Sequence, residues 1–217
     1  MIEFSRTRLS LRRSPLSYDK VRKALGPFAR RWPTRGRKAA GAYLNVGCGR
    51  NLHPDFFNID FRFYEGIDMA HDLRKPLPIA SGVARGVFTE HCLEHLDFDD
   101  VRRVLSEFHR VMRPGAVLRI SVPDIEAYVR SYAAGDPMPY GEEDAIDIGY
   151  TPAMSVNRIF YGSGHRFIYD FETLALMLGA QGFRDIAHVA FGKGRDPVLL
   201  IDQETRRAET LYVEAVR

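Results

Sequence analysis

The segment YLNVGCGRNLHPDFFNID, residues 43–60, holds the first residues whose types and spacing suggest chemistry. An apolar run ends in Gly47 and Gly49, and Asp60 follows 11 residues after Gly49. Glycines at a strand end let the backbone turn sharply and approach a ligand with no Cβ in the way. A carboxylate at the end of the next strand can accept hydrogen bonds from both hydroxyls of a ribose. Together these residues indicate a nucleoside pocket.

The spacing within this segment disfavours a dinucleotide. The dinucleotide fingerprint needs a third glycine where Leu52 stands, and its acid comes roughly 20 residues on, after a full helix. Pro54 lacks an N–H and disfavours helix in His53, so the connection is abbreviated. Such a connection argues against NAD and its pyrophosphate. We interpret Cys48 as a small filler, because nothing near it in the sequence would activate a thiolate.

A second chemically capable segment is HCLEHL, residues 91–96. Its His-x-x-Glu-His pattern occurs in zinc peptidases, where a helix brings His91 and His95 to one face beside Glu94. We disfavour a peptidase because the pattern directly follows an expected strand. A histidine of near-neutral pKa suits removal of a proton from a hydroxyl. As catalytic base we rank His91 first, since it ends a strand, then His165 in GSGHRFIYD, then His95.

Short apolar segments alternating with helical patterns must position these residues. Seven segments are predicted strands: 42–47, 56–61, 66–71, 86–91, 117–122, 186–191 and 211–216. Apolar residues at 3-4 spacing predict a helix over 99–115, and Asp170 and Gly182 bound another over 170–182. This alternation predicts an α/β fold with a mostly parallel sheet and helices on both faces. Ligands of such sheets bind at the carboxyl ends of the strands.

Two regions depart from this pattern. Between residues 124 and 168 turn-forming and acidic residues predominate, and we expect an inserted lid there, with a short helix near 153–161. Residues 1–40 hold 12 of the 31 basic residues but 2 of the 28 acidic ones, so a basic arm precedes an acidic body. We therefore expect an extension over 1–40 and one domain over 41–217.

The basic arm fits contact with anionic lipid or with a polyanion. The simpler interpretation is a solvated extension that packs a few apolar residues on the body. The arm lacks the long apolar stretch of a signal peptide, and no apolar run approaches the ~20 residues that cross a bilayer. With 2 cysteines, a disulfide framework is not expected. We expect a cytoplasmic protein, peripheral at the inner membrane if the arm binds lipid.

The order of these motifs resembles class I S-adenosylmethionine-dependent methyltransferases, above all a small bacterial group with LNVGCG, NID, DL, PLP and HxLEHL. The resemblance covers about Tyr43 to Val122, and more loosely the segment from GHRFIYD to the C-terminus. It implies a Rossmann-like, doubly wound, seven-stranded sheet, with S-adenosylmethionine as cofactor and methyltransferase activity (EC 2.1.1). Asn51 stands where the group usually has its third glycine.

The resemblance also implies roles for individual residues. The turn from Gly47 to Gly49 would hold the methionine end of the cofactor, and Asp60 its ribose. Two residues after the third strand would border the adenine, and two at the end of the fourth would face the sulfonium. The implied cofactor-binding residues are Asn45, Gly47, Cys48, Gly49, Asp60, Asp72, Leu73, Glu90 and His91.

A metal and the acceptor are left open by this resemblance. Some O-methyltransferases, including those of ubiquinone synthesis and of small-RNA 3′ ends, carry Glu-x-x-Glu-His here and bind a divalent cation. In this chain His91 replaces the first Glu and His165 could complete the set, but many enzymes with LEHL use no metal, so we rank a divalent metal second. We expect a small-molecule or glycan-like hydroxyl as acceptor. The alternatives are an RNA methyltransferase that uses the basic arm, and an S-adenosylmethionine-binding protein without activity.

Overall fold

The computed structural model describes residues 39–62, 65–136, 138 and 150–217. All of them belong to one unit, Pro33–Arg217. Most of the expected arm over 1–40 and part of the expected lid over 124–168 lie outside the described residues, so the domain boundary stays a prediction. Among the described helices, none combines the length and the apolar composition that crossing a membrane requires.

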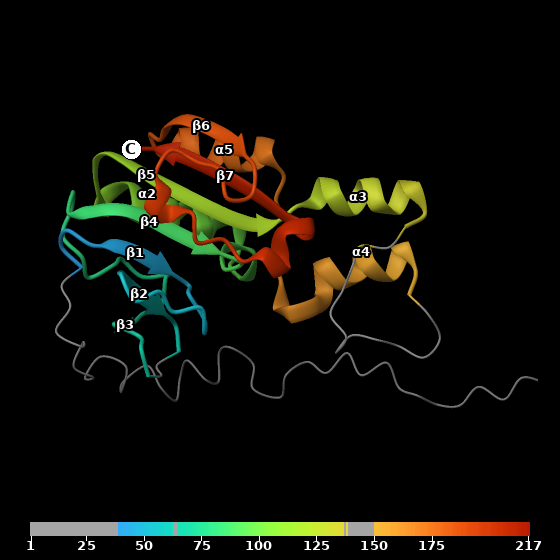
Figure 1. Ribbon diagram of the computed structural model, residues 1–217, viewed down its shortest axis with the longest axis horizontal. Coiled ribbons are helices and arrows are strands. Elements are labelled where there is room, and N and C mark those ends of the chain that lie inside the picture. Colours follow the sequence, from blue (N-terminus) through green and yellow to red (C-terminus); the bar gives the residue numbers. More distant parts are fainter. Residues whose placement is uncertain (1–38, 63–64, 137, 139–149) are drawn as a thin grey trace, which may run out of the picture. The chain divides into compact units, whose positions relative to one another are not determined.

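Seven strands form one sheet in the order β3-β2-β1-β4-β5-β7-β6 (Figure 1). The strands β1 to β5 pair in parallel, whereas β7 is antiparallel to both β5 and β6. The mostly parallel, Rossmann-like sheet is thereby confirmed. Because β2 and β4 flank β1 on opposite sides, a topological switch point lies between β1 and β4. The strands are β1 (Tyr43–Val46), β2 (Phe56–Asp60), β3 (Met69–Ala70), β4 (Ala84–Glu90), β5 (Met112–Pro123), β6 (Arg184–Val189) and β7 (Thr210–Val216).

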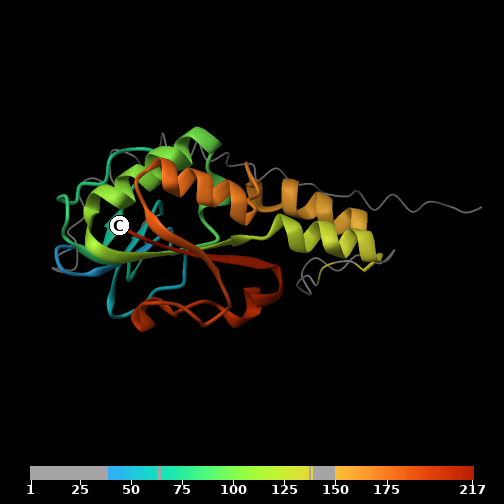
Figure 2. The same ribbon diagram turned by 90° about the horizontal axis from the view of Figure 1, so that it is seen from above.

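Two helices, α2 (Phe98–Val111) and α5 (Phe171–Ala180), cover one face of the sheet (Figure 2). Alternate strand residues such as Leu44 and Leu118 point to this face and join the main core. The buried side of α2 meets them with residues such as Phe108. The helix ends at Val111, four residues before the predicted end, because Met112 already has the extended backbone of β5.

In the described part of the chain, the connection 190–209 covers the other face in place of a long helix. It contains the short 3₁₀ helices η4 (Pro197–Leu199) and η5 (Glu204–Glu209), and Leu199 packs on apolar side chains of β2, β4 and β5. The fully buried Arg119 of β5 fastens the connection, donating to Asp202 at 2.6 and 2.8 Å and to Glu214 of β7 at 2.9 Å. We had expected helices on both faces of the sheet. On this face an irregular segment takes the place of a helix, and the buried ion pairs of Arg119 hold it there.

The described part of the lid forms two helices, α3 (Ile125–Ala134) and α4 (Pro152–Tyr161), followed by the 3₁₀ helix η3 (Gly162–Gly164). Helix α4 confirms the predicted short helix, whereas α3 was not predicted. The two helices lie side by side beyond the end of β5 (Figures 1 and 2). Tyr128 of α3 and Ile159 of α4 are buried in a small apolar cluster that joins them.

Candidate functional site

The carboxyl ends of β1, β2 and β4 meet at the switch point. After β1 the chain turns through Gly47 and Gly49, whose φ angles are +68° and +51°. After β4, His91 adopts a φ of +45° and turns the chain into the short 3₁₀ helix η1 (Leu93–His95). Residues with a Cβ rarely adopt a positive φ, and residues strained in this way cluster at functional sites. The strained backbone of His91 therefore indicates that the functional site lies at this edge of the sheet.

A hydrogen bond joins the glycine turn to Asp60. The amide of Gly49 donates to Asp60 Oδ2 at 2.8 Å, and the amide of Arg62 donates to Oδ1 at 2.8 Å. A Cβ on Gly47 would lie 2.1 Å from Cys92 Sγ, whereas no described atom lies within 4 Å of a Cβ placed on Gly49. Gly47 thus packs against the protein, and Gly49 faces open space. Each Asp60 oxygen keeps a lone pair for a ligand.

Two residues that were predicted to bind the cofactor, Asn45 and Cys48, are buried next to this turn. Asn45 is 2% exposed and its Nδ2 donates to Asn51 O at 2.9 Å and to Asn58 Oδ1 at 3.0 Å. Burial raises the pKa of Cys48 to about 12, so its thiol stays protonated near neutral pH. This agrees with its interpretation as a filler.

The two residues predicted to border the adenine follow β3. The Asp72 carboxylate accepts bonds from Arg74 Nε at 2.9 Å and Nη2 at 3.0 Å. Although partial burial opposes it, these bonds and the charge of Arg74 hold the pKa of Asp72 below its usual value. Leu73 packs at the margin of the main core. Their contact with a cofactor stays a prediction.

Glu90, at the end of β4, is held by a residue that the sequence analysis did not find. The backbone N–H of Gln203 donates to Glu90 Oε1 at 3.0 Å, and its side-chain Nε2 donates to Glu90 Oε2 at 2.6 Å. Glu90 is 9% exposed, and burial raises its pKa in spite of these bonds. Because 113 residues separate the pair, no local pattern could have predicted it.

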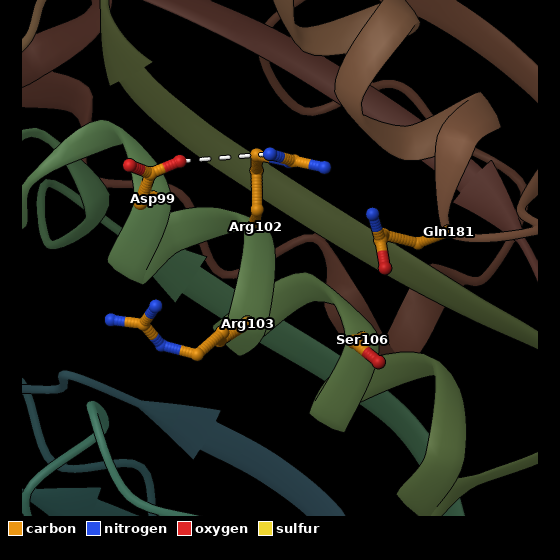
Figure 3. A pocket seen from close by; sticks show the side chains of 5 residues that line it. All are labelled: Asp99, Arg102, Arg103, Ser106 and Gln181. Carbon is orange, nitrogen blue, oxygen red and sulfur yellow. Dashed lines mark ion pairs between the residues drawn. The ribbon is translucent and has the colours of Figure 1, made fainter.

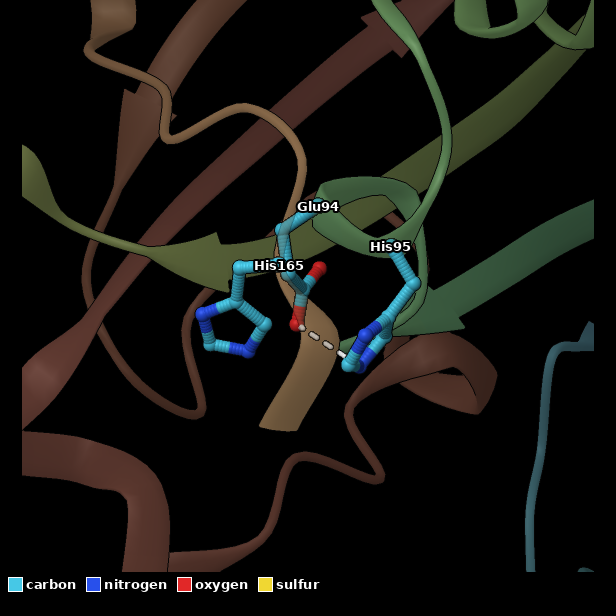
Figure 4. A group of neighbouring side chains, drawn as sticks. All are labelled: Glu94, His95 and His165. Carbon is cyan, nitrogen blue, oxygen red and sulfur yellow. Dashed lines mark ion pairs between the residues drawn. The ribbon is translucent and has the colours of Figure 1, made fainter. Parts of the chain in front are cut away.

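A buried carboxyl group surrounded by histidines lies next along the chain. Glu94 of η1 is fully buried, neither carboxyl oxygen has a hydrogen-bond partner among the described residues, and burial raises its pKa to about 8. Its Oε1 lies 3.5 Å from His91 Nδ1 and 3.9 Å from His95 Nε2. His165 reaches the same place from the lid, with its ring centroid 4.8 Å from that of His95. Figure 4 shows the Glu94 carboxyl group between these two rings.

The three histidines predicted as candidate bases are therefore gathered around Glu94. Burial lowers the pKa of His91 to about 3 and of His95 to about 4, and it also lowers that of His165. These values lie below the near-neutral pKa that we expected, so the rings are neutral at pH 7. Glu94, which we had taken as a mere companion, has a pKa shifted toward and slightly above neutrality, to about 8.

The tautomer of His165 follows from one contact. Its Nδ1 lies 2.6 Å from the carbonyl oxygen of Ile159, which can only accept. Nδ1 therefore carries the hydrogen and Nε2 the lone pair. The lid is tied to the same place, because the amide of Arg166 donates to the Glu94 carbonyl at 2.7 Å.

Among the described residues, Glu94, His95 and His165 are the group that could hold a metal ion, with ligand atoms within 4.8 Å of one another (Figure 4). Zinc with bonds of about 2.0–2.1 Å in a tetrahedron holds its ligand atoms about 3.3 Å apart. The three side chains would have to close in around an ion. His91, which we had placed in the ligand set, is outside this group.

A separate surface pocket of about 340 Å³ lies between α2 and the end of α5 (Figure 3). None of the predicted site residues lines it. Arg102 on its rim pairs with Asp99 at 3.6 Å. The lining residues are Asp99, Arg102, Arg103, Ser106 and Gln181. We therefore keep the candidate site at the switch point.

Comparison with known proteins gives a family match and a shared fold. Residues 64–120 match the model of a methyltransferase domain. No curated protein matches the chain. Among solved structures, it is similar to a SAM-dependent methyltransferase from Archaeoglobus fulgidus, with 19% identity, coverage of 93% of this chain and 95% of that one, and a TM-score of 0.52.

Two further structures extend the likeness. A possible histamine N-methyltransferase from Thermotoga maritima shares 14% identity over 90% of this chain and 91% of its own, with a TM-score of 0.51. An S-adenosylmethionine-dependent methyltransferase from Mesorhizobium loti shares 19% identity over 89% and 98%, with a TM-score of 0.50. The chain thus has the Rossmann-like fold of these methyltransferases.

Proposed function

We propose that this protein is a class I S-adenosylmethionine-dependent methyltransferase that acts on a hydroxyl group of a small-molecule or glycan-like acceptor. The observation that carries the proposal is the bond from the Gly49 amide to the Asp60 carboxylate, 2.8 Å long, at the switch point. It sets an open glycine turn beside an acid with free lone pairs. The methyltransferase-domain match over 64–120 and the shared fold support the same proposal.

The residues at the switch point fit the proposed cofactor. The open side of Gly49 leaves room for the methionine end, and Asp60 can accept hydrogen bonds from ribose hydroxyls. Glu90, clamped by Gln203, would border the pocket at the end of β4. When bound, S-adenosylmethionine supplies a methyl group on a sulfonium, which is a good leaving group. The protein must then place the acceptor atom in line with that methyl group.

The histidines around Glu94 would take up the proton that a hydroxyl acceptor releases. Because burial keeps the rings neutral at pH 7, each has a lone pair that can accept a hydrogen bond from the hydroxyl. For His165 that lone pair is on Nε2, since Nδ1 donates to Ile159. At pH 7 Glu94 is already protonated, since its pKa is about 8, so the proton from the acceptor goes to a histidine ring and not to Glu94. A hydroxyl acceptor needs such a base, because its proton must leave when the methyl group is transferred.

Calorimetry with S-adenosylmethionine and S-adenosylhomocysteine tests the first part of the proposal. We expect both to bind at one site. Incubation of the protein with S-adenosylmethionine and a panel of hydroxylated small molecules and sugars should then release S-adenosylhomocysteine. Lack of affinity for both compounds would refute the proposal. Affinity without turnover on any acceptor would favour a cofactor-binding protein that lacks activity.

A nucleic-acid acceptor remains the alternative that the composition favours, because residues 1–40 carry 12 basic side chains. Contacts between such side chains and phosphates make affinity fall steeply with salt. Mobility shifts of RNA with the full chain at about 50 and 200 mM salt test this alternative. Methylation of RNA but of no small hydroxylated acceptor would replace our assignment of the acceptor.

A further inference from the structure

Thr210, the first residue of β7, connects His91 to the backbone of η5. Its hydroxyl donates to the carbonyl oxygen of Arg206 at 2.7 Å, and His91 Nε2 lies 2.8 Å from the same hydroxyl oxygen. A threonine hydroxyl has one hydrogen to donate, and a carbonyl oxygen can only accept. With that hydrogen committed to Arg206, the oxygen of Thr210 must accept the hydrogen bond from His91. His91 Nε2 therefore carries a hydrogen.

The other nitrogen of His91 is fixed by the same argument. A neutral imidazole has one N–H, so the lone pair of His91 is on Nδ1. This atom lies 3.5 Å from Oε1 of the fully buried Glu94. The His91 side chain is 9% exposed, and its backbone has a φ of +45°. A strained backbone, a buried ring and a fixed donor together hold the lone pair toward Glu94.

The opposite arrangement would leave two oxygens in close contact with no hydrogen between them. If the Thr210 hydroxyl turned to donate to His91 Nε2, the carbonyl of Arg206 would lose its hydrogen bond to that hydroxyl. Two oxygens 2.7 Å apart repel each other when no hydrogen lies between them. This repulsion favours the tautomer with the hydrogen on Nε2.

We propose that Thr210 is a positioning residue, which holds His91 in the tautomer with hydrogen on Nε2 and directs its basic nitrogen, Nδ1, to the side of Glu94. The role in turnover rests on the proposed methyl transfer, but the tautomer does not. A hydroxyl acceptor then meets the lone pair of His91 from the side where Glu94 and His165 lie. Nε2, turned to Thr210, takes no part in proton removal.

Two-bond ¹H–¹⁵N correlation spectra of the full chain at pH 7.5, with chelator present, test the tautomer directly. His91→Gln identifies the His91 signals. We expect the wild-type ring to show the hydrogen on Nε2. Thr210→Ser, which keeps the hydroxyl, should preserve this pattern, and Thr210→Val should give a mixture or the other tautomer. Thr89→Val, which removes a buried hydroxyl from β4 two residues before His91, is the control and should leave the pattern unchanged.

Two results would overturn the proposal: a wild-type His91 with its hydrogen on Nδ1, or an unaltered tautomer in a folded Thr210→Val variant. If Thr210→Val does not fold, the wild-type spectrum and Thr210→Ser still decide. For an acceptor that the wild type methylates, Thr210→Val should lower kcat roughly 10- to 100-fold with rescue in Thr210→Ser, since a misplaced tautomer disables a catalytic histidine. The spectra need no substrate, so failure of the proposed methyl transfer would not be mistaken for failure of this inference.

Discussion

The amide of Gly49 donates a 2.8 Å hydrogen bond to Oδ2 of Asp60, and this bond ties together the carboxyl ends of β1 and β2. One carboxylate therefore shapes the turn and faces the space that the turn leaves open. A ligand that binds here finds the turn already formed, so little conformational entropy is lost on binding. The same arrangement makes Asp60 the most informative position for mutation.

Asp60→Ala should weaken binding of S-adenosylhomocysteine by ~1–3 kcal/mol, because hydrogen bonds to a charged acceptor are lost. Titration calorimetry measures this change. Asp55→Ala, which removes an exposed carboxylate five residues earlier, is the matched control and should bind as the wild type does. Equal affinity in Asp60→Ala and wild type would remove Asp60 from the ribose site.

Alanine at the two turn glycines should have different effects. Gly47→Ala places its Cβ 2.1 Å from Cys92 Sγ, so we expect a loss of stability of about 1–3 kcal/mol from overpacking. Gly49→Ala meets no described atom within 4 Å, so its cost in stability is limited to the positive φ, roughly 1 kcal/mol. Its methyl group enters the proposed ligand space, and affinity for S-adenosylhomocysteine should fall. Thermal denaturation and calorimetry on both variants separate the effects. A Gly49→Ala variant with full affinity would contradict the placement of the cofactor.

His91→Ala should lower turnover about 10²–10⁴-fold if this ring assists removal of the acceptor proton. His109→Ala is the control, because His109 lies on α2, where its ring packs edge-on against Phe183 at 5.1 Å. Both variants are compared with the wild type for release of S-adenosylhomocysteine on one acceptor. Turnover of His91→Ala at the wild-type rate would exclude His91 from the chemistry.

The sequence predicted the local structure around this candidate site. The Gly47 turn and the acid at Asp60 are each marked by a strand end, and parallel pairing of β1 with β2 brings them together. The helix at Asp170 was predicted by its N-cap, and the Asp170 side chain indeed accepts from the amide of Thr173 at 2.7 Å. Such signals lie within a few residues of one another, so a sequence pattern can contain them.

The contacts that surround the candidate site are not local. Thr210 lies 119 residues from His91, and Gln203 lies 113 from Glu90. Neither is part of a motif, because Gln203 lies in the irregular connection 190–209 and Thr210 directly follows it, and this part of the chain meets β4 only after folding. The low pKa values of the histidines were missed for the same reason, since burial depends on the whole fold. Helix α3 was missed because residues 124–134 were assigned with the loosely patterned lid, although Asp124 caps it by accepting from Glu126 at 2.9 Å.

Glu94 should make stability fall as the pH rises. Burial raises its pKa from 4.5 to about 8, so between these values the folded state holds a proton that the unfolded state releases. This contribution is fully present below about pH 4.5 and is lost as the pH rises through about 8. Glu94→Gln, which resembles the protonated form, should remove the decline and be more stable than the wild type at pH 9, by on the order of 1–3 kcal/mol. Urea denaturation from pH 5 to 9, with chelator present, measures the difference. Parallel curves for the two proteins would contradict a raised pKa at Glu94.

Removal of divalent metal should leave the protein folded and equally stable. The atoms that Glu94, His95 and His165 offer to an ion are up to 4.8 Å apart, wider than the ~3.3 Å edges of a tetrahedral zinc site. With a pKa of about 8, Glu94 also holds a proton that a metal would have to displace. We therefore expect the same melting temperature before and after dialysis against a chelator, and the same release of S-adenosylhomocysteine on an accepted substrate. His165→Gln should respond to the chelator as the wild type does. One equivalent of metal in the purified protein, lost together with stability in the chelator and missing from His165→Gln, would establish a metal site in place of the protonated carboxyl group.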